Sequence, residues 1–390
     1  MIQDPTAIFT YIIFLIGLIY YLKSLSALDN LFKYMPPVIW VYFLPMISTS
    51  IGIIPDSSIL YSWTTKHLLP PALILLLLSS NIKALAALGP KAIGTMLFGT
   101  LGIVIGGPLS LLIFGSFLPS DAWMGLGALS GSWIGGSANM VAVGKSIGTS
   151  DDLFGNMIVI DTLVGYGWMG IVIFISGHQD KIDKWNGANT DIIENLNLKI
   201  NSNSKKKHTS FNHLLTIVTV GMTLGYISLK IGEWLPDLGS ILTSFGWTII
   251  VVSAIGILLS FTKLSELDSV GSSHIGNLFL YILLATIGAK ANIMQVNNLL
   301  IYIIIGMFWI LCHAIILFLG GRILKAPMFL IATSSQANIG GVVSAPIVAT
   351  VYKKSLAPVG LLMGVMGNII GIYAGLFTAW LLSLVSGLYH

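Results

Sequence analysis

Two glycine pairs, each surrounded by small polar side chains, interrupt apolar stretches of this 390-residue chain. One pair lies in SWIGGSANM at 132–140 and the other in SQANIGG at 335–341. Glycine permits a break in a helix, and backbone groups freed by a break inside a membrane must be satisfied by protein, water, an ion or a substrate. Neutral oxygens at such a break suit sodium, and helix N-termini that point inward suit a carboxylate.

The polar residues at the two breaks are Ser130, Ser132, Ser137 and Asn139 in the first, and Thr333, Ser334, Ser335, Gln336, Asn338 and Ser344 in the second. A plainer interpretation is that small and polar residues only let membrane helices pack closely. That interpretation is adequate for any single serine. The occurrence of the same pattern twice favours a binding function for the pair of motifs.

Asp161 is the one carboxylate that the sequence places deep within an apolar run, in VIDTLVGYG at 159–167. A charge at the centre of a bilayer costs at least about 2.5–3.5 kcal/mol, so such residues face a cavity and usually serve ions, protons or substrates. Asp161 could therefore exchange a proton for an ion, and a hydrogen-bonded structural carboxyl is the alternative. Its counterpart in the second half is Asn368, an uncharged amide that argues weakly against a two-carboxylate antiporter.

Other polar residues of the apolar runs carry weaker signals. His313, beside the single cysteine Cys312, is expected to hydrogen-bond to a neighbouring helix rather than to relay protons. Several residues at run ends could line a cavity mouth or be ordinary interfacial residues: Ser79, Ser80, Asn81, Thr286 and Asn292.

No motif of a soluble enzyme is present in the sequence. It has no Walker loop, no cluster of His, Asp and Glu at metal-ligand spacing, and no serine with a plausible histidine and acid partner. GTLGIVIGG at 99–107 lies in an apolar run with no strand before it, which favours helix packing over a dinucleotide loop. We therefore expect a protein that is not an enzyme, without catalytic residues or cofactors other than a coupling ion, sodium or a proton.

The composition places these residues in a lipid bilayer. Apolar residues make up 55% of the chain and charged residues only 9%, against roughly 25% charged in an average soluble domain. Too few charges remain to coat a globular surface, so the fold class is an all-α polytopic membrane protein. The formal charge of +4 fits cytoplasmic loops of a membrane protein better than a nucleic-acid partner.

Membrane helices need about 20 mostly apolar residues. The runs that approach this length are at about 7–22, 38–54, 67–80, 92–117, 122–148, 153–177, 212–229, 241–261, 272–289, 297–320, 327–351 and 355–386. A single long hydrophilic interval, at 178–211, separates two halves at 1–177 and 212–390. It is expected to be a solvated linker, with an amphipathic surface helix around 182–200 as the alternative.

The two halves repeat one another at a nearly constant offset. The Ile-Gly-Gly at 134–136 matches that at 339–341, and 155–170 pairs with 360–375, at offsets of about 205 and 206. Such internal symmetry is typical of secondary transporters, whose halves meet at a site near the bilayer midplane.

Charge decides between two topologies. If all twelve runs cross, the lysine-rich linker violates the positive-inside rule. If 122–148 and 327–351 instead enter and leave on one side, 15 of the 19 Lys and Arg residues lie inside. Each half then has five crossings and one re-entrant hairpin, and the second half is inverted. The termini would lie outside and the linker in the cytoplasm of a cell-membrane protein; broken helices that cross are the alternative to hairpins.

At SWIGGSANM, Asp161 and SQANIGG the sequence resembles the membrane family known as domain of unknown function 819. That family is grouped with the superfamily of cation/proton antiporters and anion transporters. The resemblance implies a core domain built on two broken elements, a separate scaffold domain, an elevator-like movement and a homodimer. The scaffold is expected from the runs at 7–22, 38–54, 212–229 and 241–261.

The resemblance also implies a set of site residues. Carried over position by position, the ion and substrate region comprises Gly135, Gly136, Ser137, Asn139, Asp161, Gln336, Asn338, Gly340, Gly341 and Asn368. A sodium site would draw on Ser137, Asn139, Asp161 and Asn338. One difference from the family pattern is Val342, which follows the second glycine pair where proline is common, while Pro346 comes later.

These observations lead to one main hypothesis and two alternatives. The main hypothesis is a secondary transporter that couples sodium or proton entry to symport of a small organic anion or amino-acid-like solute. The first alternative is a sodium/proton antiporter that uses Asp161, and the second is a membrane receptor that does not transport.

Overall fold

The structure is a computed structural model that describes residues 2–34, 37–80, 85, 88–188, 208–238, 243–291, 299–352 and 356–389. The described chain is helical, which confirms the all-α class. Its first half contains α1 (Pro5–Lys23), η1 (Ser26–Leu28), α2 (Asp29–Tyr34), α3 (Pro37–Ser50), α4 (Ile59–Leu78), α6 (Gly89–Phe114), η2 (Gly115–Phe117), α7 (Ala122–Gly135), α8 (Ser137–Ser146) and α9 (Asp151–Ser176). After α10 (Gln179–Asn186) follow α12 (Phe211–Trp234), α13 (Ser244–Ser260), η3 (Lys263–Val270), α14 (Ser272–Lys290), α15 (Leu299–Ile323), α16 (Met328–Ile339), α17 (Gly341–Tyr352) and α18 (Ala357–Ser386).

Seven of the described helices are long and apolar enough to cross a membrane: α1, α6 with η2, α9, α12, α14, α15 and α18. α13 and η3 form an eighth candidate that is bent by 92°. The chain is therefore a polytopic membrane protein. Two helices that we expected to cross are not in this group. α3 has only 14 residues, about 21 Å at 1.5 Å per residue, and α4 carries Lys66 and His67 in its first half.

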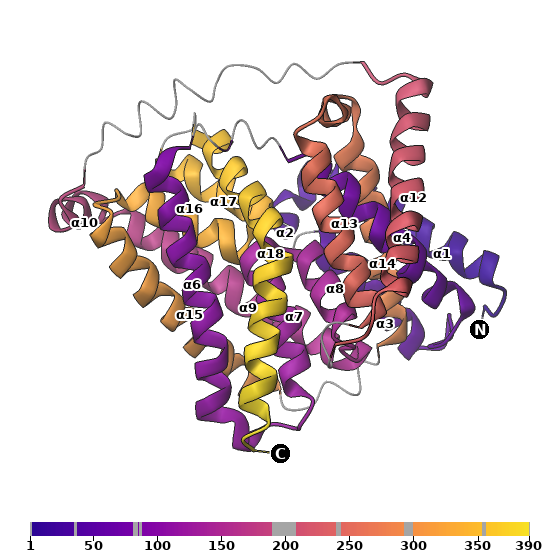
Figure 1. Ribbon diagram of the computed structural model, residues 1–390, viewed down its shortest axis with the longest axis horizontal. Helices are drawn as coiled ribbons and strands as arrows, with labels where there is room; N and C mark the ends of the chain where they lie inside the picture. The colour runs from indigo at the N-terminus through magenta and orange to yellow at the C-terminus, as the bar shows by residue number, and fades with distance from the viewer. Residues whose placement is uncertain are drawn as a thin grey trace.

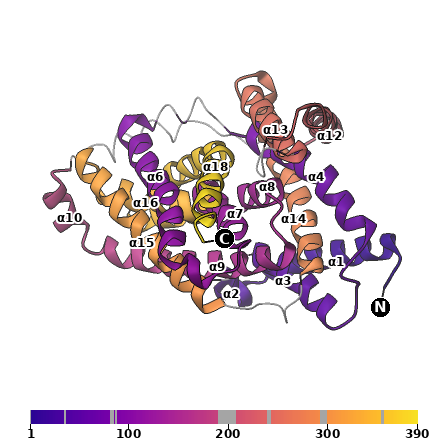
Figure 2. The same ribbon diagram turned by 60° about the horizontal axis from the view of Figure 1, so that its bottom comes forward.

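The helices gather into two bundles (Figures 1 and 2). The first, here called the α4 bundle, consists of α1, α3, α4, α12, α13 and α14. The second, the α18 bundle, consists of α6 to α9 and α15 to α18. Packing within each bundle is dense, while α8, α9 and α18 make fewer contacts with α13 and α14 of the other bundle. Each half of the chain contributes its first helices to the α4 bundle and its later ones to the α18 bundle, in the same order.

The expected scaffold runs at 7–22, 38–54, 212–229 and 241–261 all fall in the α4 bundle. This bundle also contains α4 and α14, which pack at its centre. Glycines allow α12 and α14 to pack closely against α4. A Cβ at Gly225 of α12 would lie 2.8 Å from Pro71, and one at Gly276 of α14 would lie 3.2 Å from the Ala72 carbonyl. The hydroxyls of Thr64 and Thr286 also bond at 2.8 Å. The inverted relation of the halves and their boundaries at 177 and 212 stay predictions.

Both glycine-rich runs fold back on themselves as helical hairpins. In the first, α7 and α8 turn at Gly136, whose φ is +86°, and the Thr149 hydroxyl donates to the Met124 carbonyl near the open end. In the second, α16 and α17 turn at Gly340 and Gly341, and the rings of Phe329 and Tyr352 meet at 5.6 Å at the open end. Hairpins, rather than straight broken helices, are therefore the form that these runs adopt.

α10 begins the hydrophilic interval and docks on the start of the second hairpin. The Asn186 side-chain amide donates to the carbonyls of Gly321 and Ala326, at 3.2 and 2.5 Å. Asp183 accepts from the Met328 N–H at 2.6 Å, which caps the first turn of α16. The structure tests the alternative of a surface helix around 182–200 only in part, because α10 ends at Asn186 and 189–207 lies outside the described residues.

Glycines of α18 form the surface on which both hairpins rest. A Cβ at Gly364 would lie 2.6 Å from the Val342 nitrogen, and one at Gly371 would lie 2.9 Å from the Gly135 Cα. A Cβ at Gly367 would lie 2.6 Å from the Ile134 carbonyl of α7 and 3.1 Å from the Ala337 carbonyl of α16. Backbone therefore approaches backbone directly, as small residues allow in membrane interiors.

We expect Gly367→Ala to lower the free energy of unfolding by about 1–3 kcal/mol, because the added methyl must push two carbonyls away. Thermal unfolding of the purified protein measures the loss. Gly170→Ala is the matched control, since that helical glycine of α9 has open space around it and should be neutral or slightly stabilising. Equal unfolding temperatures for the two variants would contradict the proposed close approach.

Candidate functional site

A cavity of about 1050 Å³ lies between the two bundles. The α18 bundle lines it with both hairpin turns and with parts of α9 and α18. The α4 bundle lines it with parts of α1, α3, α4, η3 and α14. The site is therefore built where the two bundles face each other.

The tips of the two hairpins meet at this cavity. A Cβ at Gly341 would lie 3.6 Å from the Gly136 Cα and 3.9 Å from the Gly135 carbonyl oxygen. Both Gly136 and Gly341 have positive φ, which favours glycine because it carries no Cβ. α8 and α17 start at these turns, so their first backbone N–H groups, which have no acceptor within the helix, face one region. The two helix N-termini bring partial positive charge to that region, and the C-termini of α7 and α16, which end at the same turns, bring partial negative charge.

Asp161 contributes a carboxylate to the same cavity from the middle of α9. Its Oδ2 accepts a hydrogen bond from the Ser132 hydroxyl at 2.8 Å, and its Oδ1 accepts one from the Trp133 indole N–H at 2.9 Å. Both donors are neutral and belong to α7. Within the described ranges, Asp161 has no ion-pair partner, so the carboxylate has room for a proton or a cation on its cavity side.

Trp133 is held in place by a second indole. Its ring meets that of Trp309 edge to face at 5.0 Å between centroids, and the Trp309 N–H donates to the Ile103 carbonyl at 2.8 Å. Both indoles are fully buried. The hydrogen bond to Asp161 is therefore preorganised by α6 and α15.

Seven of the ten residues implied by the family resemblance line the cavity: Gly135, Gly136, Ser137, Asp161, Gly340, Gly341 and Asn368. The break in the second hairpin falls at Gly340 and Gly341 although Val342 follows, and Pro346 lies inside α17. The turn therefore depends on the glycines rather than on proline.

Asn139, Gln336 and Asn338 do not line the cavity; they are buried behind the hairpin tips. The Asn338 amide accepts from Thr100 at 3.2 Å and donates to the Met96 carbonyl at 3.3 Å, so it fastens α16 to α6. Of the four suggested sodium ligands, Ser137 and Asp161 thus face the cavity, whereas Asn139 and Asn338 do not.

The opposite wall contains polar residues that sequence reasoning did not select. Asn277 and Ser273 of α14 line the cavity, and Lys23 and Asp268 are exposed at its rim. No sequence signal distinguishes them from ordinary interfacial residues. Of the suggested mouth residues, Ser79 and Ser80 do line the cavity, Thr286 pairs with Thr64 instead, and Asn81 and Asn292 lie outside the described residues.

His313 is a structural residue, as expected. Its Nδ1 lies 2.9 Å from the Gly99 carbonyl and its Nε2 lies 2.9 Å from the Ser335 hydroxyl. That hydroxyl oxygen accepts from the Trp168 indole N–H at 2.7 Å. A neutral imidazole with its proton on Nδ1 satisfies every partner, because the ring then donates to the carbonyl and accepts from the hydroxyl.

Comparison with known proteins agrees with the family resemblance of the motifs. The family described as protein of unknown function DUF819 matches residues 10–385. The chain belongs to this family. The uncharacterized membrane protein YjcL of Bacillus subtilis strain 168 is 22% identical over 347 residues, which cover 85% of this chain and 86% of the relative. The similarity thus extends over both halves and both hairpins.

A double-mutant cycle tests the hydrogen bond between Ser132 and Asp161. We expect a coupling energy of about 1 kcal/mol between Ser132→Ala and Asp161→Asn in thermal unfolding, because each change removes the same charge-assisted bond. Ser130→Ala is the matched control, since its hydroxyl donates to backbone carbonyls of Gly127 and Gly375. That variant should be additive with Asp161→Asn within about 0.5 kcal/mol. Additive behaviour of Ser132→Ala would refute the bond.

Proposed function

We propose that this protein is a secondary active transporter that couples sodium or proton movement to the symport of a small organic anion or amino-acid-like solute. The observation that carries the proposal is the meeting of two hairpin tips beside Asp161, in a cavity between two bundles. Secondary transporters with internal repeats bind their substrates at broken helices of this kind.

Electrostatics at the cavity support both parts of the proposal. The N-termini of α8 and α17 offer backbone N–H groups to an anionic group. Asp161, with only neutral donors around it, offers its charge to sodium, a proton or an ammonium group. A solute with a carboxylate, together with a cation at Asp161, would neutralise the site and lower the cost of its burial.

Cavity size favours a solute over a bare ion. A volume of about 1050 Å³ is at the upper end of the roughly 300–1,000 Å³ typical of small-molecule sites. A site that only exchanges sodium and protons needs far less room. A sodium/proton antiporter is the second candidate, supported by Asp161 alone.

The division into two bundles supports an elevator-type cycle. The α18 bundle carries both hairpins and Asp161, while the α4 bundle supplies the facing wall. The sparser interface between them would let one bundle slide against the other. Homodimer formation through the α4 bundle belongs to the same proposal and follows from the family resemblance.

The distribution of Lys and Arg supports the proposed orientation in the cell membrane, with the linker in the cytoplasm and both termini outside, because 15 of the 19 lie on the linker side. That topology leaves four lysines outside. Each of them pairs with a carboxylate: Lys66 and Lys230 with Glu233, and Lys145 and Lys290 with Asp151. The two carboxylates thus offset half of the positive charge of the four lysines.

Ligand-dependent unfolding of the purified protein tests the proposal. We expect sodium, compared with potassium, to raise the unfolding temperature, and one class among amino acids, dicarboxylates and short peptides to raise it further in sodium. A ligand at about 100 times its Kd stabilises the folded state by about 2.7 kcal/mol. Uptake of that solute into proteoliposomes, driven by a sodium gradient or a pH gradient, then identifies the coupling ion.

Asp161→Asn separates the two candidates. In the symporter, the variant should lose or weaken cation stabilisation while the solute still binds. In the antiporter, sodium alone stabilises, protons compete with it, and both effects disappear in the variant. Asp268→Asn is the control, because this exposed carboxylate of the cavity rim should leave the sodium effect unchanged. Sodium stabilisation that no organic solute increases would reject symport.

A further inference from the structure

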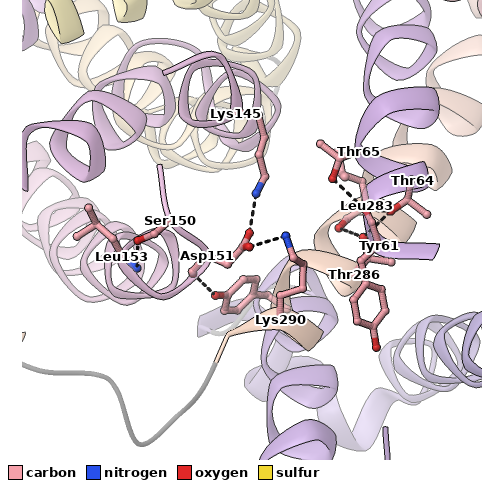
Figure 3. A network of polar contacts seen from close by, with 11 residues as sticks. Tyr61, Thr64, Thr65, Lys145, Ser150, Asp151, Leu153, Leu283, Thr286 and Lys290 are labelled. Atoms are coloured by element: carbon pink, nitrogen blue, oxygen red, sulfur yellow. Dashed lines mark hydrogen bonds and ion pairs between the residues drawn. The ribbon is translucent and has the colours of Figure 1, made fainter. Parts of the chain in front are cut away.

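One carboxylate binds two lysines, one from each bundle (Figure 3). Asp151, the first residue of α9, lies between Lys145 of α8 and Lys290 of α14, and each ammonium nitrogen is 2.6 Å from one carboxylate oxygen. Lys145 and Asp151 belong to the α18 bundle, whereas Lys290 is the last residue of α14 in the α4 bundle. The bond between Asp151 and Lys290 therefore crosses the interface between the bundles.

The network is shielded from solvent. The exposed fractions of the side chains are 12% for Lys145, 19% for Asp151 and 34% for Lys290. Partial burial strengthens such a pair compared with a pair on the surface, because solvent screens it less. Two neutral bonds lie nearby: the Tyr42 hydroxyl donates to the Asp151 carbonyl at 3.4 Å, and the Thr243 hydroxyl donates to the Ser146 carbonyl at 3.3 Å.

The cavity opens at the other end of α14. Exposed Lys23 and Asp268 form its rim, together with Ser273 in the first turn of α14, whereas Phe154 and Leu284 are buried at its depth. α14 has 19 residues, a length of about 28 Å, so Lys290 and this rim are separated by about the thickness of a bilayer core. The Thr209 hydroxyl, just before α12, donates to the Val270 carbonyl of η3, which places the rim at the linker end.

We infer that the pair of Asp151 and Lys290 is a latch that closes the cavity at the end remote from the linker and must break in each transport cycle. The inference rests on the proposed alternating access between the bundles. The α18 bundle cannot move relative to α14 while this bond holds. Opening at the remote end requires the carboxylate to leave Lys290 and to keep only Lys145, which moves with it.

The latch closes the cavity at the remote end, and the repeat provides no equivalent latch at the linker end. The segment after the first hairpin contains Asp151 and Asp152, but the corresponding segment after the second, TVYKKSLAPVG at 350–360, contains no Asp or Glu. The repeat therefore offers no matching carboxylate for closure at the linker end. This asymmetry favours the conformation that is open at the linker end as the resting state.

Thiol labelling from each side of the membrane tests the latch. In a Cys312→Ser background, Ile158→Cys places a reporter on α9 within the cavity, one helical turn from Asp161. A membrane-impermeant maleimide is added to vesicles of both orientations. With the reporter alone, we expect labelling from the linker side. Lys290→Gln should raise the initial labelling rate from the remote side by roughly threefold to tenfold, because loss of the latch populates a conformation that is otherwise minor.

Three variants serve as controls. Lys145→Gln should leave the labelling unchanged, because its partner Asp151 lies in the same bundle and keeps Lys290. Glu233→Gln should also change nothing, since it joins Lys66 of α4 to Lys230 of α12 within the α4 bundle. Lys290→Arg should restore the background pattern. Rescue by arginine excludes misfolding as the cause of remote labelling.

Equal remote labelling of Lys290→Gln and Lys145→Gln, or no increase in either, would overturn the latch. The assay needs no solute, so its result is independent of the transport assay. If remote labelling rises but no solute or ion gradient supports uptake, the latch stands and the proposed function fails. If uptake occurs and labelling does not change, the function stands and the latch fails.

Discussion

The hairpin tips meet through direct contact between backbones, and the arrangement of the site follows from that contact. Gly364, Gly367 and Gly371 let α17, α16 and α7 approach the backbone of α18 to van der Waals distance, and Gly136 meets Gly341 where the hairpins turn. Side chains at these positions would hold the tips apart. Because the tips meet, two helix N-termini and Asp161 share one cavity, which no single hairpin could provide.

Around this site, several buried polar groups have structural partners. His313, Ser335 and Trp168 form one satisfied chain, and Asn338 fastens α16 to α6. Buried polar groups are costly unless they are paired, so such bonds fix the hairpins relative to α6, α9 and α15. Asp161 differs from them, because it faces the cavity and carries a charge with only neutral donors.

The two ion networks centred on Asp151 and Glu233 show how location changes the role of one interaction type. The Glu233 network lies within the α4 bundle on exposed side chains, where such pairs contribute little to stability. The Asp151 network lies at the interface of the bundles and is shielded. A bond inside a rigid body supports it, whereas a bond across an interface controls whether the bodies separate.

Composition, glycine pairs and a buried carboxylate are local features, so the sequence alone predicted the membrane class, the apolar runs, the breaks at both glycine pairs and Asp161. It left hairpins and broken crossing helices as alternatives at those breaks. Tertiary structure decided which residues share a site. It assigned α4 and α14 to the α4 bundle, buried Asn139, Gln336 and Asn338 behind the tips, and brought Asn277 to the cavity. It also joined Asp151 to Lys290, which are far apart along the chain. Such pairings depend on helix packing between distant segments, which hydrophobic periodicity and spacing do not encode.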